Sequence, residues 1–313
     1  METKYKEIIN SKLNSFSEEL NEIKKKQLIF TGSMVGSGIL FIALACAIKD
    51  GSSLFMFLTF IEVIVFGVLL SKLKNRKKKA IWDAQNDFYD EVYAGMIAEE
   101  IGGTHESSFF KKTKKEIEQY LGEIIEKKEE SYNGILDGKA YSIEFAKGTV
   151  ISQTTTKDGQ VVSYRTQDLF TGTDFSVRCN RKADSDILLT TGLNKEDKAD
   201  KGSKKRIKMD DKRFPFEVYC DDDIAAYKFL TPGIMSELQN FASSRSINSI
   251  EVNGEQLKVD MNDAIINMDP GIKFTTNVEK LKQRYTYEYI YSLAHPQAEN
   301  FRQLLYSTLT VVR

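Results

Sequence analysis

Residues 27–48 read QLIFTGSMVGSGILFIALACAI, and residues 54–71 read LFMFLTFIEVIVFGVLLS. The first stretch carries no charged side chain, and as a helix it would be ~33 Å long, enough to cross a hydrocarbon core of ~30 Å. The second would be ~27 Å long and contains one charge, Glu62. Only residues 49–53, KDGSS, join the two stretches. The sequence therefore predicts a two-helix transmembrane hairpin over residues 27–71.

Basic residues flank this hairpin at its two outer ends, and the joining segment has only Lys49. The flanking cations are Lys24, Lys25, Lys26, Lys72, Lys74, Arg76, Lys77, Lys78 and Lys79. The positive-inside rule then predicts a two-pass protein of the plasma membrane with both termini in the cytoplasm. An anionic leaflet would attract these cations. Two alternatives fit the length and order of the two stretches less well than a transmembrane hairpin does. One is a buried hairpin of a soluble protein, and the other is a cleaved or lipidated signal ending near Cys46.

Glu62 is an ionisable group expected near the middle of the bilayer, where a charge is costly. Counted from the turn, its depth matches that of Ser37 on the first helix, so we expect a hydrogen bond between them. Gly32 and Gly36 form a small-xxx-small pair that we expect to let the two helices approach closely. A contact with another copy in a homo-oligomer, and an ion or proton relay, remain open as alternative roles for Glu62.

Composition excludes several classes of function. The chain has 44 basic and 45 acidic residues, so no net positive charge suggests nucleic-acid binding. Three widely spaced cysteines and two histidines form no metal-binding pattern and suit a reducing compartment. We find no catalytic, cofactor-binding or metal-binding signature in the sequence, and Cys220 falls on the apolar face of an expected strand, where a thiol is usually buried.

Hydropathy and its period divide the rest of the chain into three further segments. Residues 1–26 predict an amphipathic helix that leads into the first span. Residues 72–132 predict a basic juxtamembrane segment with helices, one ending at Gly102-Gly103 and another covering residues 107–128. Residues 133–313 predict a cytosolic α+β domain built on an antiparallel sheet with helices.

Within this last domain the local signals are uneven. The Asn253-Gly254 pair predicts a hairpin between strands 249–252 and 256–261. Thr231 and Pro232 predict the start of a helix that runs to about Ser244. A helix is expected from residue 277 to 293, because Pro296 would prevent it from continuing further. The segment 193–205 is charged and contains glycine, so we expect a loop there.

Two segments together resemble a known family. The strand Asp168–Gly172 (DLFTG) and the block Arg213–Leu238 (RFPFEVYCDDDIAAYKFLTPGIMSEL) resemble DUF3137, a bacterial family of unknown function, as does the two-span N-terminus. The resemblance extends over most of residues 27–290, although Asn267-Met268-Asp269 stands where the family has a Phe-Glu-Pro-like end. It implies a membrane-anchored bacterial protein and transfers no catalytic residue.

The acidic turn Asp221, Asp222 and Asp223 invites a metal-site interpretation, as do Asp210-Asp211 and the pair Asp260 and Asp263. Consecutive aspartates point in different directions, so the turn more simply caps the following helix. We therefore expect a membrane-anchored cytosolic domain that binds a membrane-associated protein or a lipid headgroup. The alternatives are an enzyme that acts on a lipid or envelope precursor at the acidic turn, and a small channel or transporter subunit that uses Glu62.

Overall fold

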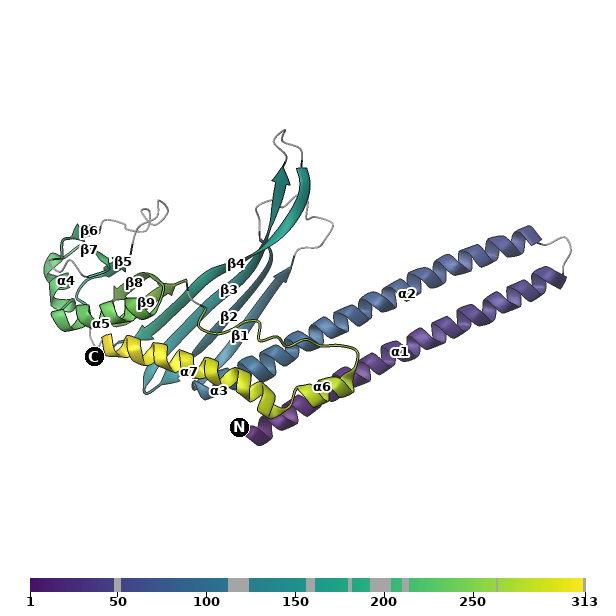
Figure 1. Cartoon of the computed structure of the whole chain (residues 1–313), viewed down its shortest axis with the longest axis horizontal. Helices are drawn as coiled ribbons and strands as arrows, with labels where there is room; N and C mark the ends of the chain where they lie inside the picture. The colour runs from purple at the N-terminus through teal and green to yellow at the C-terminus, as the bar shows by residue number, and fades with distance from the viewer. Residues whose placement is uncertain are drawn as a thin grey trace. The chain divides into compact units, whose positions relative to one another are not determined.

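A computed structural model describes residues 1–47, 52–111, 124–155, 161–179, 182–191, 204–209, 214–262 and 264–311 (Figure 1). The chain divides into two compact units. The first contains Met1–Tyr93 and Asp269–Ser292, and the second contains Ala94–Met268 and Leu293–Arg313. Each unit has its own layers and its own apolar core, so they are described in turn. The expected joining segment 49–53 lies mostly outside the described residues, and so do Asp210, Asp211, Asp263 and most of the expected loop 193–205.

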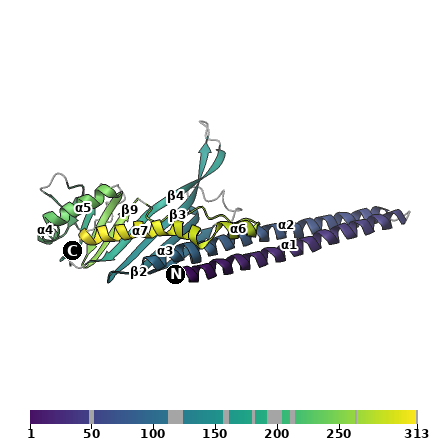
Figure 2. The same ribbon diagram turned by 60° about the horizontal axis from the view of Figure 1, so that its bottom comes forward.

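Two long helices dominate the first unit and run antiparallel, side by side (Figures 1 and 2). They are α1 (Glu2–Ala47) and α2 (Ser52–Phe88), and the π-helical turn η1 (Tyr89–Ala94) continues α2. The expected amphipathic helix and the first apolar stretch thus form one uninterrupted helix, α1. The Ser37 hydroxyl donates a hydrogen bond to Glu62, and Lys12 pairs with Glu91 near the N-terminal end of α1.

The N-terminal half of α1 is packed into a core. Its buried residues recur every three or four positions, which places them on one face of the helix. They are Tyr5, Ile9, Leu13, Phe16, Leu20 and Ile23. The ring of Phe274 lies 5.3 Å from those of both Phe16 and Phe88, and Tyr285, which follows α6 (Val278–Arg284), stacks on Phe274 at 5.8 Å. These aromatic contacts close the core of the first unit.

The apolar halves of α1 and α2 make no comparable core. One helical stretch of the described residues, Glu2–Leu44, is long and apolar enough to cross a membrane, and none of its apolar window is buried. Exposure reaches 75% for Leu28 and 66% for Ile42 on α1, and 63% for Phe60 on α2. The two halves of one helix pair therefore have opposite environments.

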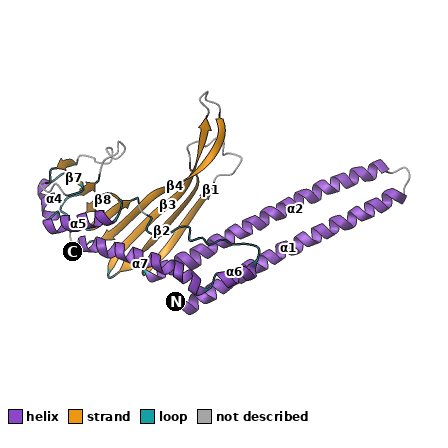
Figure 3. Cartoon of the chain, in the orientation of Figure 1, coloured by secondary structure: helices purple, strands orange, loops and turns teal. Residues whose placement is uncertain are grey.

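The second unit contains a nine-stranded antiparallel sheet within the described residues (Figure 3). Its order is β1-β2-β3-β4-β9-β8-β5-β7-β6. The strands are β1 (Gly103–Lys111), β2 (Ile124–Leu136), β3 (Lys139–Thr155), β4 (Val161–Arg178), β5 (Ile187–Thr190), β6 (Lys205–Ile207), β7 (Glu217–Cys220), β8 (Ile247–Asn253) and β9 (Gln256–Met261). The chain is thus α+β with a large antiparallel sheet, as predicted.

Helices cover one face of this sheet. They are α3 (Gly95–Glu100), α4 (Asp223–Phe229), α5 (Pro232–Ser244) and, from Leu293 onward, α7 (Tyr287–Val311). Phe301 of α7 lies between the rings of Tyr141 on β3, at 4.9 Å, and Phe175 on β4, at 6.1 Å. Because side chains alternate along a strand, the neighbours of these residues point to the opposite face.

Three expectations about secondary structure need correction. The expected helix over 107–128 is wrong where the structure describes it, because residues 107–111 belong to β1 and 124–128 to β2, paired antiparallel. Its apolar residues 117–121 lie outside the described part. The single helix expected over 277–293 is wrong, because α6 ends at Arg284 and α7 begins at Tyr287. Strand β5 has no counterpart among the expected elements. Pro296 does not break α7, because Ala294, Ala298 and Phe301 continue one buried stripe past it, and this packing outweighs the lost hydrogen bond.

Several local predictions are confirmed. Gly254 adopts a positive φ of 57° in the turn between β8 and β9, where the Asn253-Gly254 pair predicted a hairpin. The Thr231 side chain caps α5 and Pro232 opens it. Gly102 has a φ of 70° directly after α3, which marks the end of the helical segment as predicted.

Candidate functional site

Ser37 and Glu62 are brought together across α1 and α2, at the depth at which the sequence paired them. The Ser37 hydroxyl contacts Glu62 Oε1 and also lies 2.7 Å from the backbone oxygen of Ser33. Both side chains sit within the apolar halves of their helices. The geometry gives the Glu62 carboxyl one interhelical hydrogen-bond partner.

Gly32 and Gly36 on α1 do not form the close contact with α2 that the sequence suggested. A Cβ built at Gly32 or Gly36 would meet no atom within 4 Å, so these positions do not lie against α2. The half-buried residues of this part of α1 are Phe30, Met34, Ser37, Gly38 and Phe41, which follow a different helical face. The expectation that Gly32 and Gly36 allow α1 and α2 to approach closely is therefore wrong.

The two basic segments lie at one height on the hairpin. Two contacts set the register between the helices, Ser37 with Glu62 and Lys12 with Glu91. Within α1, the hydrogen bond from Lys26 holds the pKa of Glu22 below its usual range, and the charge of Arg76 on α2 adds to this in small part. Residues 24–26 of α1 are therefore level with the start of the basic run on α2. We call the nine flanking cations, Lys24, Lys25, Lys26, Lys72, Lys74, Arg76, Lys77, Lys78 and Lys79, the basic collar.

The acidic turn forms a helix cap. The Asp222 carboxylate accepts hydrogen bonds from the backbone amides of Ile224, at 2.8 Å, and Ala225, at 3.3 Å, at the start of α4. Asp221, Asp222 and Asp223 are all exposed. Over the part of the chain that the structure describes, no group of three His, Cys, Asp or Glu side chains is arranged to bind a metal ion. Cys220, next to this turn, is fully buried.

A groove of about 540 Å³ lies on the second unit and was not anticipated from the sequence. Its lining comes from β1 to β4 and includes Glu106, Ser108, Glu129, Glu144 and Asp174. Glu144 lies between the buried residues Ile143 and Phe145, so its side chain points away from the face that α7 covers. The groove is therefore on the face opposite these helices.

The register of the sheet concentrates negative charge in this groove. Glu144 on β3 is level with Asp174 on β4, which is level with Asp260 on β9. Nearby cations offset part of this charge, since Lys258 lies 3.9 Å from Asp174 and Lys127 pairs with Glu129. In sequence, alternation along β3 and β4 was the one signal that could have indicated a polar face on these strands.

A second charged cluster is buried on the helix-covered face of β1 and β2. The Glu130 side chain is inaccessible to solvent and lies 2.6 Å from Lys128 Nζ and 3.5 Å from His105 Nε2. Burial would by itself raise the pKa of Glu130, but the nearby His105 ring and the charge of Lys128 outweigh burial and hold the pKa below its usual range. The ring of Tyr132 packs on His105 at 4.8 Å. The cluster keeps an ionised carboxylate inside the unit.

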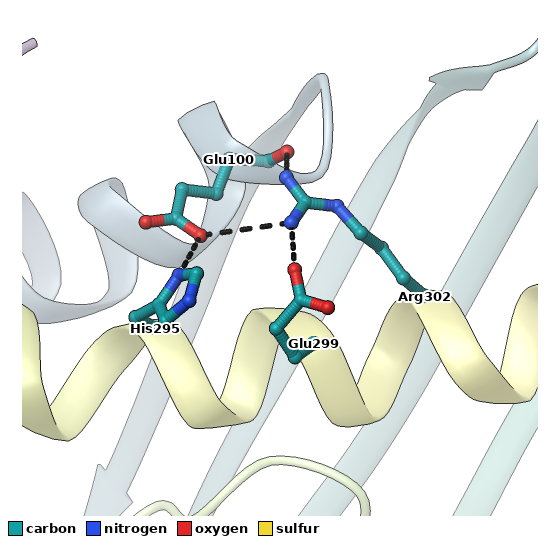
Figure 4. Close-up of polar contacts among 4 residues, drawn as sticks. All are labelled: Glu100, His295, Glu299 and Arg302. Carbon is teal, nitrogen blue, oxygen red and sulfur yellow. Dashed lines mark hydrogen bonds and ion pairs between the residues drawn. The ribbon is translucent and has the colours of Figure 1, made fainter.

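A third polar cluster joins α3 to α7 (Figure 4). Glu100, at the end of α3, is nearly buried, and its carboxylate lies 2.9 Å from His295 Nδ1. Arg302 donates a hydrogen bond to the backbone oxygen of Glu100 and pairs with Glu299. Because Arg302 occupies a terminal carbonyl of a very short helix, this cluster holds α3 and α7 together. These contacts between the two helices are typical of a structural clamp, and the second carboxylate oxygen, Glu100 Oε1, is buried without a hydrogen-bond partner among the described residues.

The comparisons with known proteins bear on part of the chain. Residues 168–289 match the family DUF3137, described as "Protein of unknown function". The resemblance predicted from the sequence is confirmed over these residues, which make up less than half of the chain. A search of curated proteins finds no match. The crystal structure of the mycobacterial trehalose monomycolate transport factor A, TtfA, is similar with a TM-score of 0.30 and 11% identity, over 69% of this chain and 93% of that one. At that score it carries no argument about this chain.

The DUF3137 region contains only some of these features. It includes the Asp222 cap, Cys220 and one carboxylate of the groove, Asp174. The hairpin α1–α2, the basic collar and the buried Glu130 all precede it. The features that concern a membrane therefore rest on this chain's own sequence and structure.

Proposed function

We propose that this protein is a membrane-anchored binding domain. Helices α1 and α2 insert residues 27–48 and 54–71 into the plasma membrane as a two-pass hairpin. The remaining α+β part is held at the inner face of that membrane, with both termini in the cytoplasm. Anchoring raises the effective concentration of the domain toward partners in the same membrane, which favours binding without requiring a catalytic site.

The observation that carries this proposal is the apolar belt on the hairpin. We define the apolar belt by its twelve large side chains that are at least half exposed: Leu28, Ile29, Val35, Ile39, Leu40, Ile42, Phe57, Phe60, Val63, Ile64, Val65 and Val68. Fully burying one such side chain contributes ~1.5–3 kcal/mol, so covering twelve half-exposed ones is worth on the order of 10 kcal/mol. A soluble monomer rarely leaves so large an apolar surface in water.

The hairpin geometry supports the topology. Antiparallel α1 and α2 enter and leave a bilayer on the same side, and the basic collar lies at that end of the apolar belt. Since cations collect on the cytoplasmic side, the collar favours a cytoplasmic location for both termini. The hydrogen bond between Ser37 and Glu62 favours a packing role for this carboxyl over ion conduction.

The sheet face offers a surface for a partner. The groove of about 540 Å³ lies opposite α7, and its lining includes the exposed polar side chains of Glu106, Ser108, Glu129, Glu144 and Asp174. We propose that a membrane-associated protein or a lipid headgroup binds there. The exposed Asp222 cap and the buried Cys220 supply no comparable surface, so the groove is where we place the binding activity.

Topology is tested by cysteine accessibility in intact cells. In a full-length chain freed of Cys46, Cys179 and Cys220, Ser53→Cys marks the joining segment and Ser243→Cys marks an exposed position on α5. A membrane-impermeant maleimide should label only the first in intact cells and both after permeabilisation. Labelling at position 243 from outside would reverse the orientation. Extraction of the chain by alkaline carbonate would refute insertion.

The binding surface is tested in the same cells by photo-crosslinking. A photoreactive side chain at Glu144, inside the groove, should give a discrete adduct that the same side chain at Ser243, on the helix-covered side, does not give. Mass spectrometry of the adduct then distinguishes a protein from a lipid. Identical adduct patterns from the two positions would contradict a binding role for the groove.

A further inference from the structure

We propose that the basic collar binds the phosphate groups of anionic phospholipids, so that the hairpin gathers acidic lipids around itself. This rests on the proposed function, because the collar meets headgroups only if the apolar belt is inserted. What it adds is a ligand class, the anionic lipid phosphate, and a set of residues that contact it.

The first support is that the collar is one surface although its residues come from two helices. Two contacts fix the register between the two long helices: Ser37 on α1 with Glu62 on α2, and Lys12 on α1 with Glu91 in the turn η1 that continues α2. In this register residues 24–26 are level with residues 73–75. At 1.5 Å per residue, the run 72–79 spans ~10 Å along the helix axis. Nine cations are thus concentrated in one short section of the hairpin.

The second support is that these cations are accessible and little neutralised. Seven of the nine are exposed, and Lys26 and Lys77 are half-buried. Neither residues 23–47 of α1 nor residues 63–82 of α2 contain an acidic side chain. The acidic neighbour on the N-terminal side is Glu22, which pairs with Lys26. The collar therefore keeps a large positive charge on the surface.

The third support is the position of the collar next to the apolar belt. Leu28, 75% exposed, follows Lys26 by two residues, and Val68, 52% exposed, precedes Lys72 by four. When the belt occupies the hydrocarbon core, the collar lies in the headgroup layer, which is ~5–8 Å thick on each side. The anions at that depth are lipid phosphates. Lysine and arginine near an anionic surface each strengthen membrane attachment, by roughly fivefold.

The test measures lipid selectivity of the full chain in vesicles. Chain-labelled spin lipids report how strongly phosphatidylglycerol is preferred over phosphatidylcholine in the lipid shell of the inserted protein. We expect a preference of about twofold or more at low salt. The preference should collapse toward one at about 1 M salt, where the Debye length falls to ~3 Å from ~30 Å at 0.01 M.

Two variants with equal charge change locate the effect. The collar variant replaces Lys72, Lys74 and Lys78 by Gln, and the control variant replaces the exposed Lys182, Lys205 and Lys280 by Gln. The collar variant should lose at least half of the excess preference for phosphatidylglycerol, and the control should keep it. Replacing the three collar lysines by Arg should also keep it, because charge and not a particular side chain is recognised.

Flotation of the same samples separates this inference from the proposed function. If the wild-type chain floats with vesicles, anchoring stands. The collar proposal is then refuted if the wild-type chain shows equal affinity for the two lipids, or if the control variant loses as much preference as the collar variant. If the wild-type chain does not float, both anchoring and the collar proposal are refuted.

Discussion

The ring of Phe301 joins α7 to the sheet of the second unit, and truncating it should loosen that sheet. Phe301 is fully buried between Tyr141 and Phe175, with ring centroids at 4.9 and 6.1 Å. Phe301→Ala removes both aromatic contacts and leaves a cavity that the paired strands β3 and β4 cannot fill without losing their register. The expected result is a selective loss of protection in β3 and β4.

The magnitude follows from burial. Replacing a fully buried phenylalanine by alanine costs about 3–5 kcal/mol, the sum of lost transfer free energy and the cavity. A domain's whole stability is only ~5–15 kcal/mol, so the change is a large fraction of it. Since ~1.4 kcal/mol is a tenfold change in an equilibrium constant, local opening should become about 10² to 10³·⁵ times more frequent.

The assay is amide hydrogen exchange of the full chain, read by mass spectrometry on peptides from β3 and β4. Gln303→Ala, an exposed change on the same helix, is the matched control and should stay within ~0.5 kcal/mol. Phe301→Leu keeps most of the volume and should cost less than ~1.5 kcal/mol, which remains measurable if the alanine variant does not fold. If the exchange rates of β3 and β4 in Phe301→Ala lay within about threefold of those in the Gln303→Ala control, the assigned role of this ring would be refuted.

Two further predictions concern polar groups. Asp222→Ala should destabilise α4 by ~1 kcal/mol, because the amides of Ile224 and Ala225 lose their hydrogen-bond acceptor. Asp222→Asn should retain most of the cap. Equal amide exchange rates in α4 for the two variants would contradict this prediction. Because the pKa of Glu130 is depressed in the fold, its ionised form stabilises the unit above the ordinary pKa of 4.5, and that stability is lost as pH falls through the lower folded value. Exchange in β2 should therefore accelerate in acid for the wild type, and this acid-sensitive component should be absent from Glu130→Gln.

Sequence patterns predicted well wherever the deciding interaction is local. The apolar stretch that begins at Leu28 gave a helix, Asn253-Gly254 gave a hairpin, and the residues Thr231 and Asp222 gave helix caps. Each of these features depends on residues within about one turn or one span of one another. The match to DUF3137 over residues 168–289 likewise follows from contiguous sequence.

The missed features all depend on partners far away in the chain. Residues 107–111 form a strand because they pair with residues 126–130, and their own sequence has no clear period. Strand β5 is four residues long and is held between β8 and β7, which follow it by some thirty to sixty residues. Pro296 stays inside α7 because Ala294 before it and Ala298 and Phe301 after it are buried.

The candidate site divides in the same way. The sequence by itself determined the two apolar stretches and the cations that flank them, because hydropathy and charge act residue by residue. Only the tertiary structure decided that the two basic segments are level, that Gly32 and Gly36 point away from α2, and that Glu144, Asp174 and Asp260 share one row of the sheet. Register between strands and between helices is fixed by packing over the whole interface, and a shift of one residue would redirect every side chain.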